Sequence, residues 1–321
     1  DSGLRRNDEV GTFYEAINLN SNLKIELRLN MVTPLSSLKA RGLKPRKSLG
    51  QNFLADPGTA ETIIRRCRFS GRETVLEIGA GTGALTLAAA RQVALVQAVE
   101  SDGRLVEILK QNLGEEGLDN VMVIQADFMD TDLSALAASA GTNLTVIGNL
   151  PYYLSSQILV RLIAYRQLFD RAVLMFQQEL ADRLTASPGG RDYGRLSVML
   201  RYCAEVSLLL RVKRHLFFPR PEVDSQVLQI DFTRRETPVD CPDLILFKII
   251  KAAFGKRRKT IKNALSSGGL GLTPEIWTTI LERAGISPEV RAETLDAPDY
   301  VEICRYYRQI RNNKPTGQGD D

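Results

Sequence analysis

Short apolar runs alternate with amphipathic stretches along the first two thirds of the chain. Five runs have the length and aliphatic composition of buried strands, and they occupy residues 74–79, 95–100, 121–125, 144–149 and 172–177. The stretches between them, such as 84–92 and 103–113, are long enough to form helices that cross from one strand to the next. This alternation is typical of a parallel sheet covered by helices on both faces. The pattern therefore predicts an α/β fold with a doubly wound, Rossmann-like sheet.

The hydrophobic spacing changes in the last third. Runs at 206–212 and 226–232, joined by a loop rich in Phe and Pro, predict antiparallel edge strands, so the sheet would end near Phe232. Beyond Pro238, apolar residues recur at helical spacing on one face, namely Leu246, Phe247, Ile250 and Phe254. The pairs Thr273-Pro274 and Ser287-Pro288 have the composition of helix starts. We therefore predict a small all-helical C-terminal domain.

Composition narrows the class of protein. The 321 residues are 44% hydrophobic, and 42 Lys and Arg face 38 Asp and Glu, so a basic surface requires local clustering of like charges. Four scattered cysteines and a single histidine, His215, predict a reduced cytoplasmic protein without a metal site, with His215 in a surface loop. No apolar run approaches the roughly 18 residues of a membrane span. We expect a monomer that does not contact a membrane.

A glycine-rich segment follows the first predicted strand. It reads EIGAGTGA over residues 77–84, and its glycines allow a tight turn that brings the backbone close to a ligand. Read as GxGxxA, with Glu100 ending the next strand to bind a ribose, it matches a nicotinamide dinucleotide site. Read as ExGxGxG, it equally matches an S-adenosylmethionine site, whose ligand also carries a ribose. The loop alone leaves both cofactors open.

The next two strand ends favour S-adenosylmethionine. Asp127 is placed to accept from an adenine amine and Phe128 to flank the ring, at the sheet edge where open α/β folds bind ligands. The alternative is that Asp127 only caps the following helix. The fourth strand then brings Asn149 to the same edge, beside the place expected for a reactive methyl group.

The fourth strand ends in the corner Asn149-Leu150-Pro151-Tyr152, which by residue type is a turn. An adenine amine is a poor nucleophile because its lone pair is delocalised into the ring. Acceptors on the Asn149 side chain and on a main-chain carbonyl held by Pro151 would favour a pyramidal nitrogen, which stabilises the transition state more than the ground state. Tyr152 would stack on the base, which is worth roughly 1–3 kcal/mol and offsets the cost of extruding the nucleotide.

Several segments, taken in order, resemble one family. They are SLGQNFL (48–54), EIGAGTGALT (77–86), ADF (126–128), NLPYYLSS (149–156), QQELADRL (177–184), YGRLSV (193–198), FFPRPEVDS (217–225) and AFGKRRKTIKNAL (253–265). From about residue 44 to 310 the chain resembles the small-subunit ribosomal RNA adenine N6,N6-dimethyltransferases, the KsgA family. The resemblance implies S-adenosylmethionine-dependent dimethylation of two adjacent adenosines in the 3′-terminal hairpin loop of 16S rRNA, on an assembling small ribosomal subunit.

The resemblance also implies roles for individual residues. Residues of the cofactor site would be Gln51, Asn52 and Leu54, which would lie over the cofactor, together with Glu77, Gly79, Gly81, Glu100, Asp127, Phe128 and Asn149. Residues at the chemistry would be Asn149, Leu150, Pro151 and Tyr152, with Phe217 facing the target adenine opposite Tyr152. Two positions depart from the family pattern: Tyr153 stands where Asn is frequent, and Arg220 interrupts a frequent triple proline.

A basic run near the C-terminus completes the prediction. On a helix, it would bind RNA phosphates without reading sequence, through Lys256, Arg257, Arg258, Lys259 and Lys262, unless it is only a solvated helix face. The predicted layout is a non-native or disordered extension (1–30), a basic leader (31–47), an S-adenosylmethionine-dependent methyltransferase domain (48–235), a helical RNA-binding domain (238–311) and a disordered tail (312–321).

Rival classes remain on the sequence alone. A binding protein of this fold could lack catalysis, but the complete set of expected site residues argues against it. A dehydrogenase remains possible from the glycine-rich loop. DNA adenine and protein amide methyltransferases use a similar Asn-Pro-Tyr corner, yet neither class explains the basic C-terminal run.

Overall fold

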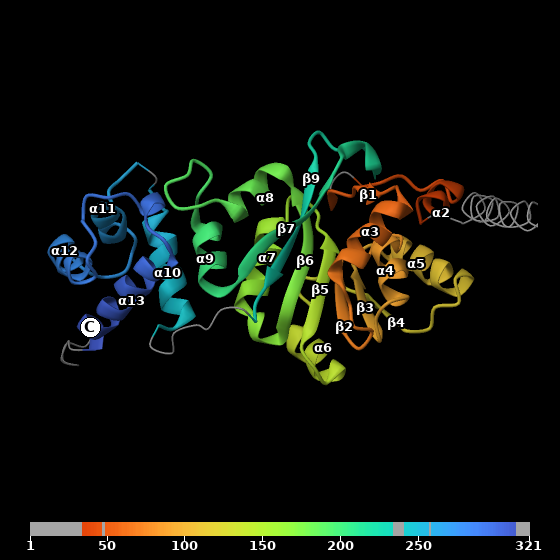
Figure 1. The fold of residues 1–321 in the computed structure, drawn as a ribbon, viewed down its shortest axis with the longest axis horizontal. Coiled ribbons are helices and arrows are strands. Elements are labelled where there is room, and N and C mark those ends of the chain that lie inside the picture. The colour runs from red at the N-terminus through yellow and green to blue at the C-terminus, as the bar shows by residue number, and fades with distance from the viewer. Residues whose placement is uncertain (1–33, 47–48, 234–240, 257, 313–321) are drawn as a thin grey trace, which may run out of the picture.

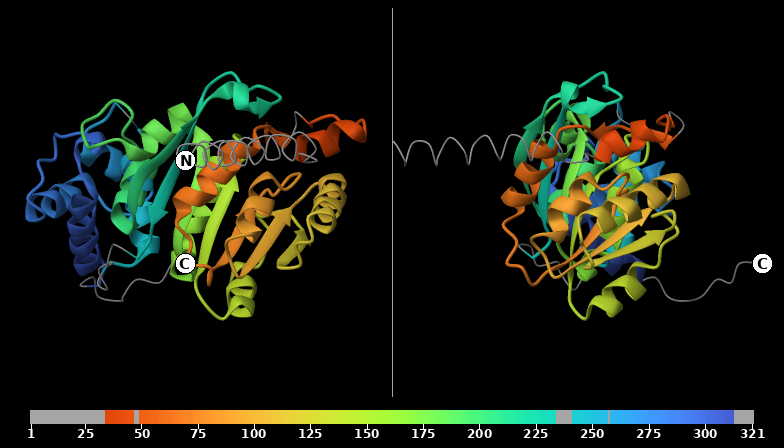
Figure 2. Two further views of the ribbon diagram at one scale, coloured as in Figure 1. Left: turned by 45° about the vertical axis from the view of Figure 1, so that its right-hand side comes forward. Right: turned by 90° about the vertical axis from the view of Figure 1, so that its right-hand side faces the viewer.

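A computed structural model describes residues 34–46, 49–233, 241–256 and 258–312. A central sheet has helices on both faces, and a group of helices lies at one end (Figures 1 and 2). The predicted extension at 1–30 lies outside the described residues, as does the predicted tail except for Asn312. That residue ends helix α13. Of the basic leader, residues 34–46 are described, and they contain helix α2 (Pro34–Ala40).

The main sheet has seven strands in the order β4-β3-β2-β5-β6-β9-β7. The strands are β2 (Thr74–Ile78), β3 (Leu95–Glu100), β4 (Val121–Gln125), β5 (Leu144–Asn149), β6 (Phe169–Gln177), β7 (Glu205–Val212) and β9 (Ser225–Asp231). The first five are parallel, and β9 and β7 add antiparallel strands. The predicted doubly wound sheet is confirmed. Because the strand order reverses beside β2, the carboxyl ends of β2 and β5 form the crevice where such sheets bind ligands.

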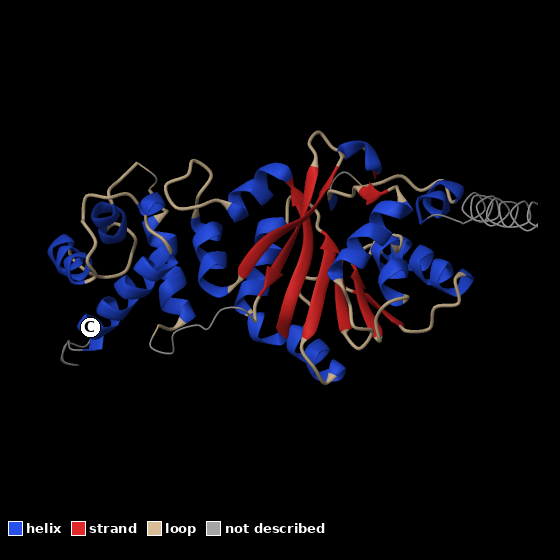
Figure 3. Ribbon diagram, in the orientation of Figure 1, coloured by secondary structure: helices blue, strands red, loops and turns tan. Residues whose placement is uncertain are grey.

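Helices cover both faces of this sheet (Figure 3). One hydrophobic cluster joins one face of the sheet to α3 (Pro57–Cys67), α4 (Ala84–Ala90) and α5 (Gly103–Glu115). A second, larger cluster joins the other face to α6 (Leu133–Ala140), α7 (Ser155–Ala164), α8 (Gln178–Thr185) and α9 (Arg195–Cys203). Apolar residues therefore line both faces of the parallel strands, as their continuous apolar runs require.

The C-terminal region is helical, as its spacing predicts. Its helices are α10 (Asp243–Ala253), α11 (Ile261–Ser266), α12 (Pro274–Arg283) and α13 (Ala297–Asn312). Trp277 is fully buried there and stacks on Tyr307 at a centroid distance of 5.6 Å. These helices share one continuous hydrophobic cluster with α9 and the sheet, and Arg201 pairs with Asp296 at 2.7 Å across that boundary.

Two local predictions in this region are wrong. Most of the basic run does not lie on a helix, because α10 ends at Ala253 and Thr260 caps the start of α11 through its side chain. Lys256, Arg258 and Lys259 lie between the two helices, and only Lys262 of the predicted RNA-binding residues lies on α11. Ser287-Pro288 does not start a helix either. The carbonyls of Pro288 and Val290 accept from the N–H groups of Lys262 and Ile261 instead, so tertiary contacts at the start of α11 hold this segment as a turn.

A second sheet of two short strands lies near the carboxyl ends of the main strands (Figures 1 and 3). Strand β1 (Phe53–Leu54) pairs antiparallel with β8 (Phe217–Phe218). A further bond joins the Ala55 N–H to the Leu216 carbonyl at 2.7 Å. Hydrophobic spacing does not reveal such short strands. Their pairing brings the residues before α3 against the loop between β7 and β9.

Candidate active site

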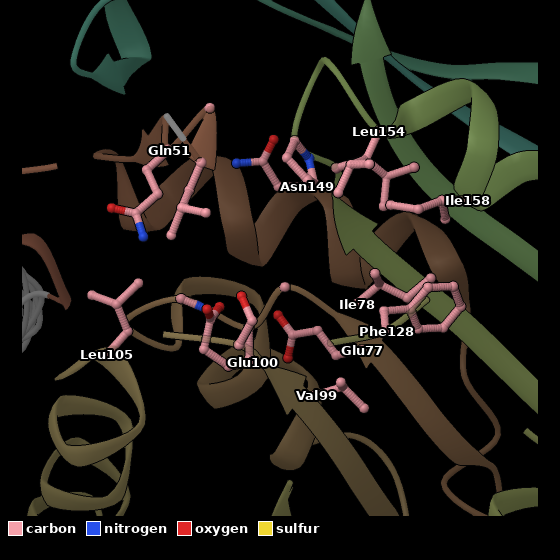
Figure 4. Close-up of a pocket in the computed structure, with 18 of the residues that line it drawn as sticks. Gln51, Glu77, Ile78, Val99, Glu100, Leu105, Phe128, Asn149, Leu154 and Ile158 are labelled. Atoms are coloured by element: carbon pink, nitrogen blue, oxygen red, sulfur yellow. The ribbon is translucent and has the colours of Figure 1, made fainter. Parts of the chain in front are cut away.

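A cavity opens at the carboxyl ends of β2, β3, β4 and β5, and residues 49–54 form part of its wall (Figure 4). Its empty space, including the open mouth, is about 1110 Å³, which is ample for a nucleoside-sized ligand. Twelve residues expected in the site line it: Gln51, Asn52, Leu54, Glu77, Gly79, Gly81, Glu100, Asp127, Phe128, Asn149, Leu150 and Pro151. Segments distant in sequence therefore meet as the strand ends predict.

The glycine-rich turn forms one wall of the cavity. Gly79, Gly81 and Gly83 all have positive φ, at 70°, 58° and 96°, a conformation that L-residues with a side chain adopt only under strain. A Cβ on Gly83 would also lie 2.7 Å from Leu109 Cδ1. The Gly79 and Ala80 N–H groups bond to the Val99 carbonyl at 2.9 and 3.1 Å. The turn is thus held tightly against the end of β3.

Glu100 fixes the same turn through its side chain. One carboxylate oxygen accepts from the Gly81 N–H at 2.9 Å and the other from the Asp102 N–H at 2.8 Å. The side chain is buried, and burial raises its pKa. Each carboxylate oxygen has a further lone pair. Glu100 can therefore hold the turn and still accept from a ligand hydroxyl.

Glu77 is a buried acid without a full set of partners. It is only 2% exposed, and its Oε2 has no hydrogen-bond partner. Burial, and secondarily the nearby Glu100 charge, raise the pKa of Glu77 to about 8. An unpaired buried oxygen is costly. Since Glu77 lines the cavity, its environment suits a ligand that brings an N–H donor or a positive charge.

The segment after β4 forms another wall. Oδ1 of Asp127 accepts from the Met129 N–H at 2.8 Å, so this acid does stabilise a local turn. It does not cap the next helix, because Asp132 caps α6. Phe128 is 6% exposed and lines the cavity. Asp127 is exposed and Phe128 is buried, and their contacts with a cofactor stay a prediction.

Arg161 of α7 holds this segment in place, and sequence reasoning missed it. Its guanidinium donates to the carbonyls of Met129 at 2.6 Å and Thr131 at 2.5 Å. It also lies over the Phe128 ring, 5.9 Å from the centroid. No spacing signal marks this role, because the contacts join α7 to a loop about 30 residues earlier. Arg161 therefore determines the shape of the cavity without lining it.

Asn149 lies across the cavity from Glu77 and Glu100 (Figure 4). The Asn149 amide donates to the Asn52 carbonyl at 2.8 Å, which fixes the amide plane and leaves its Oδ1 free to act as an acceptor. The Pro151 carbonyl accepts from the Leu154 N–H and the Ser155 hydroxyl, each at 3.0 Å. The corner is therefore a turn, as its residue types predict, and helix α7 begins directly after it.

Two aromatic residues expected at the chemistry, Tyr152 and Phe217, lie outside the cavity that Asn149 lines. Tyr152 is half-buried, its hydroxyl is 3.3 Å from the Ser225 hydroxyl, and neither Tyr152 nor Phe217 lines the cavity. Phe217 is 4% exposed and belongs to the hydrophobic cluster that includes Leu54. Tyr153, which the sequence left without a role, does line the cavity. The prediction that Phe217 faces a target base opposite Tyr152 stays a prediction.

Arg46 and Gln51 are attached to Asp102, just after β3, by hydrogen bonds and an ion pair. Gln51 Nε2 donates to Asp102 at 3.1 Å, and Gln51 Oε1 accepts from the Arg46 N–H at 2.8 Å. Bonding to Arg104 lowers the pKa of Asp102 to about 2. Asp102 was not singled out by sequence reasoning, although it occupies the cap position before α5. This network holds residues 49–54 over the cavity.

The predicted RNA-binding residues lie away from this cavity. Lys256, Arg258 and Lys259 are exposed in the turn between α10 and α11. Arg257 lies outside the described residues. Lys262 pairs with Glu289 at 3.3 Å, so its charge is partly compensated. His215 is exposed between β7 and β8, as expected for a surface loop.

Comparisons with known proteins agree with this geometry. The sequence profile described as ribosomal RNA adenine dimethylase matches residues 42–309. A protein named ribosomal RNA small subunit methyltransferase A from Desulforapulum autotrophicum is 47% identical over 85% of this chain and 95% of its own. The protein of the same name from Pelotomaculum thermopropionicum is 41% identical over 83% of this chain and 92% of its own length. The crystal structure of a dimethyladenosine transferase from Plasmodium falciparum superposes with a TM-score of 0.68 at 25% identity, over 80% of this chain and 98% of that one.

Proposed function

The chain belongs to the ribosomal RNA adenine dimethylase family, and from that premise we propose that it uses S-adenosylmethionine to dimethylate the N6 amines of two adjacent adenosines in the 3′-terminal hairpin loop of small-subunit rRNA. Membership makes it an rRNA-modifying methyltransferase, which excludes the dehydrogenase and non-catalytic interpretations. The substrate would be the assembling small ribosomal subunit, met by a monomeric enzyme in the cytoplasm. No helix in the described part of the chain has the length and apolarity of a membrane span.

The wall residues suit this cofactor in three places. Glu100 can accept from the ribose hydroxyls, and Asp127 from the adenine amine, beside the Phe128 ring. The unpaired Oε2 of Glu77 suits the ammonium of the methionine part. The glycine-rich turn lines the same cavity, and its glycines would let the backbone approach the ligand closely. S-adenosylmethionine supplies an electrophilic methyl group when bound.

The observation that carries the proposal is the hydrogen bond from the Asn149 amide to the Asn52 carbonyl. Because Nδ2 is engaged with the protein, Oδ1 accepts, and it is the acceptor that an adenine N6–H requires. The Pro151 carbonyl is already occupied by α7. The Leu150 carbonyl, fixed by the Pro151 ring, is therefore the proposed second acceptor. Acceptors held in advance cost no reorganisation during reaction.

No side chain has to remove a proton before attack. Bonds from the amine to Oδ1 of Asn149 and to the Leu150 carbonyl would turn the nitrogen lone pair toward the methyl group. The N–C bond would form as the methyl–sulfur bond breaks, S-adenosylhomocysteine would leave, and water would take the proton afterwards. Positioning of the two reactants is the larger contribution, since orientation supplies roughly 7–11 kcal/mol in favourable cases. Exposed Lys256, Arg258 and Lys259 would bind phosphates remote from the chemistry.

Primer extension tests the proposal. Small subunits from a strain that lacks the native activity are incubated with the protein and S-adenosylmethionine, and reverse transcription should then stop at two adjacent adenosines, because dimethylation blocks the Watson–Crick edge. Stops at other positions would contradict the assigned target. Equilibrium dialysis with labelled S-adenosylmethionine and with NAD tests the cofactor separately; retention of NAD alone would refute it.

A further inference from the structure

Tyr153 is an exposed aromatic ring at the mouth of the cavity. It lines that cavity and is 55% exposed. The other large hydrophobic side chains exposed in the described part of the chain are aliphatic, namely Met122, Leu208, Val223 and Leu244. An exposed ring does not contribute the stabilising free energy that burial of its apolar surface would give. Because Tyr153 also lines the cavity, its ring can offer a stacking surface to a base that enters there.

The ring has one protected side. A Cβ added to Gly50 would lie 3.1 Å from Tyr153 Cδ1 and 3.4 Å from Cε1. Gly50 has a φ of 59°, so both its conformation and the nearby ring favour glycine at this position. Gly50 thus lies against one side of the Tyr153 ring. Tyr153 as a whole is 55% exposed.

The preceding tyrosine has a different environment. The Tyr152 hydroxyl contacts Ser225 at the start of β9, and burial raises its pKa. Tyr152 does not line the cavity, whereas Tyr153 does. Two consecutive tyrosines therefore lie on different sides of the same corner. A nucleotide chain that delivers one base to Asn149 must pass the mouth at which Tyr153 is exposed.

We propose that Tyr153 is the stacking surface for the nucleobase adjacent to the target adenosine. The inference rests on the proposed function, which places two adjacent adenosines at this site. When the target base leaves its stack, the neighbouring base loses a stacking partner and exposes an apolar face. The exposed Tyr153 ring offers a replacement. An aromatic residue that stacks one base contributes roughly 5- to 150-fold in affinity.

A purely structural role would have another signature. If Tyr153 only held residues 49–52, its removal would loosen their contacts with Asn149 and Asp102, so cofactor binding and thermal stability would fall. If Tyr153 stacks a base, its removal leaves cofactor binding and thermal stability unchanged and lowers the affinity for RNA. Tyr153→Phe keeps the ring in either case, while Leu244→Ala is a control for loss of an exposed hydrophobic group on α10.

The experiment compares wild type with Tyr153→Ala, Tyr153→Phe and Leu244→Ala. Full-length protein binds a small-subunit RNA hairpin that carries 2-aminopurine in place of the adenosine adjacent to the target. We expect the 2-aminopurine fluorescence to be quenched on binding to wild type, Tyr153→Phe and Leu244→Ala. In Tyr153→Ala this quenching should be lost. The KM for small subunits should rise roughly 5- to 150-fold in Tyr153→Ala, with unchanged affinity for S-adenosylmethionine.

Wild-type quenching and KM in Tyr153→Ala would overturn the inference. So would a loss of cofactor affinity equal to the loss of RNA affinity, because that result assigns the ring to residues 49–52. Failure of the proposed function has a different result: wild type itself would produce no primer-extension stops. The quenching measurement does not require turnover, so it separates a loss of base stacking from a loss of methyl transfer.

Discussion

The two halves of the cavity are built in different ways. In the cofactor half, the glycine-rich turn, Glu100 and the segment after β4 lie directly at strand ends, and their bonds are either local or join neighbouring strands. In the target half, Asn149 depends on the carbonyl of Asn52, 97 residues earlier, and Tyr152 contacts Ser225, 73 residues later. The cofactor half follows from the sheet topology. The target half exists only once remote segments have come together.

This difference indicates where substitutions should act. Several independent contacts fix the cofactor half, namely the backbone bonds of the glycine-rich turn and the two bonds that the Glu100 carboxylate accepts. The target half relies on single contacts, so one substitution there should remove function while leaving fold and cofactor site intact.

Asn149→Ala should have the largest effect. It removes an acceptor that acts on the developing charge in the transition state, and the loss of one such preorganised group costs about 10²–10³ in kcat. Binding of S-adenosylmethionine should change only a few-fold, because the cofactor half keeps its own contacts. Single-turnover methylation and equilibrium dialysis measure the two quantities separately. Wild-type turnover in this variant would refute the role of the corner.

Arg161→Ala tests whether the cofactor half also depends on a remote contact. The substitution removes two hydrogen bonds from a charged donor to the carbonyls of Met129 and Thr131, and it should lower the free energy of unfolding by about 2 kcal/mol. The KM for S-adenosylmethionine should rise while kcat changes little. Arg161→Lys should recover part of the stability, since lysine keeps the charge but cannot span both carbonyls. Equal losses in kcat and kcat/KM would contradict a positioning role.

The sequence predicts the cofactor half well for a physical reason. Strands β3, β4 and β5 match the predicted runs to the residue. β3 and β5 are almost entirely buried and read as continuous apolar segments with polar residues at their ends. β4 is a half-exposed edge strand that its aliphatic run still marks. Those ends supply Glu100, Asp127 and Asn149. The parallel topology then brings all three to one edge.

The target half is harder to predict because pairing across long separations has no local signal. The two-residue strands β1 and β8 carry no periodicity, and their register decides where Phe217 lies. The side chains of Tyr152 and Tyr153 diverge at a corner whose geometry depends on Gly50 and Ser225. Motif resemblance names the residues in this half, but only the folded contacts distinguish Tyr153, which lines the cavity, from the half-buried Tyr152.

The pH dependence of stability probes the buried acid of the cofactor half. The pKa of Glu77 is raised to about 8 in the folded state, from 4.5, so between these values the folded protein keeps a proton that the unfolded chain has lost. The free energy of unfolding should therefore fall as pH rises from about 4.5 to about 8, by at most about 1.4 kcal/mol per unit. Glu77→Gln should lack this slope.

Denaturant titrations at pH 6, 7 and 8 measure the slope in both proteins. S-adenosylmethionine should weaken the slope in wild type, because a cation beside Glu77 favours its ionised form. An identical slope in wild type and Glu77→Gln would show that another group is responsible.

The smallest effect concerns charges that lie outside both halves. Lys256→Ala and Lys259→Ala each remove an exposed charge from the turn between α10 and α11, and each should reduce the slope of log K against log salt by about one, with a modest uniform loss of RNA affinity. Lys110→Ala is the matched control, because Lys110 is also exposed, at 57%, but lies on α5 next to Glu107. If the Lys110 variant changed the salt slope equally, phosphate binding would not be localised to this turn. If only the two turn variants changed it, with kcat preserved, the basic turn would supply affinity alone, while chemistry would stay with the single contacts around Asn149.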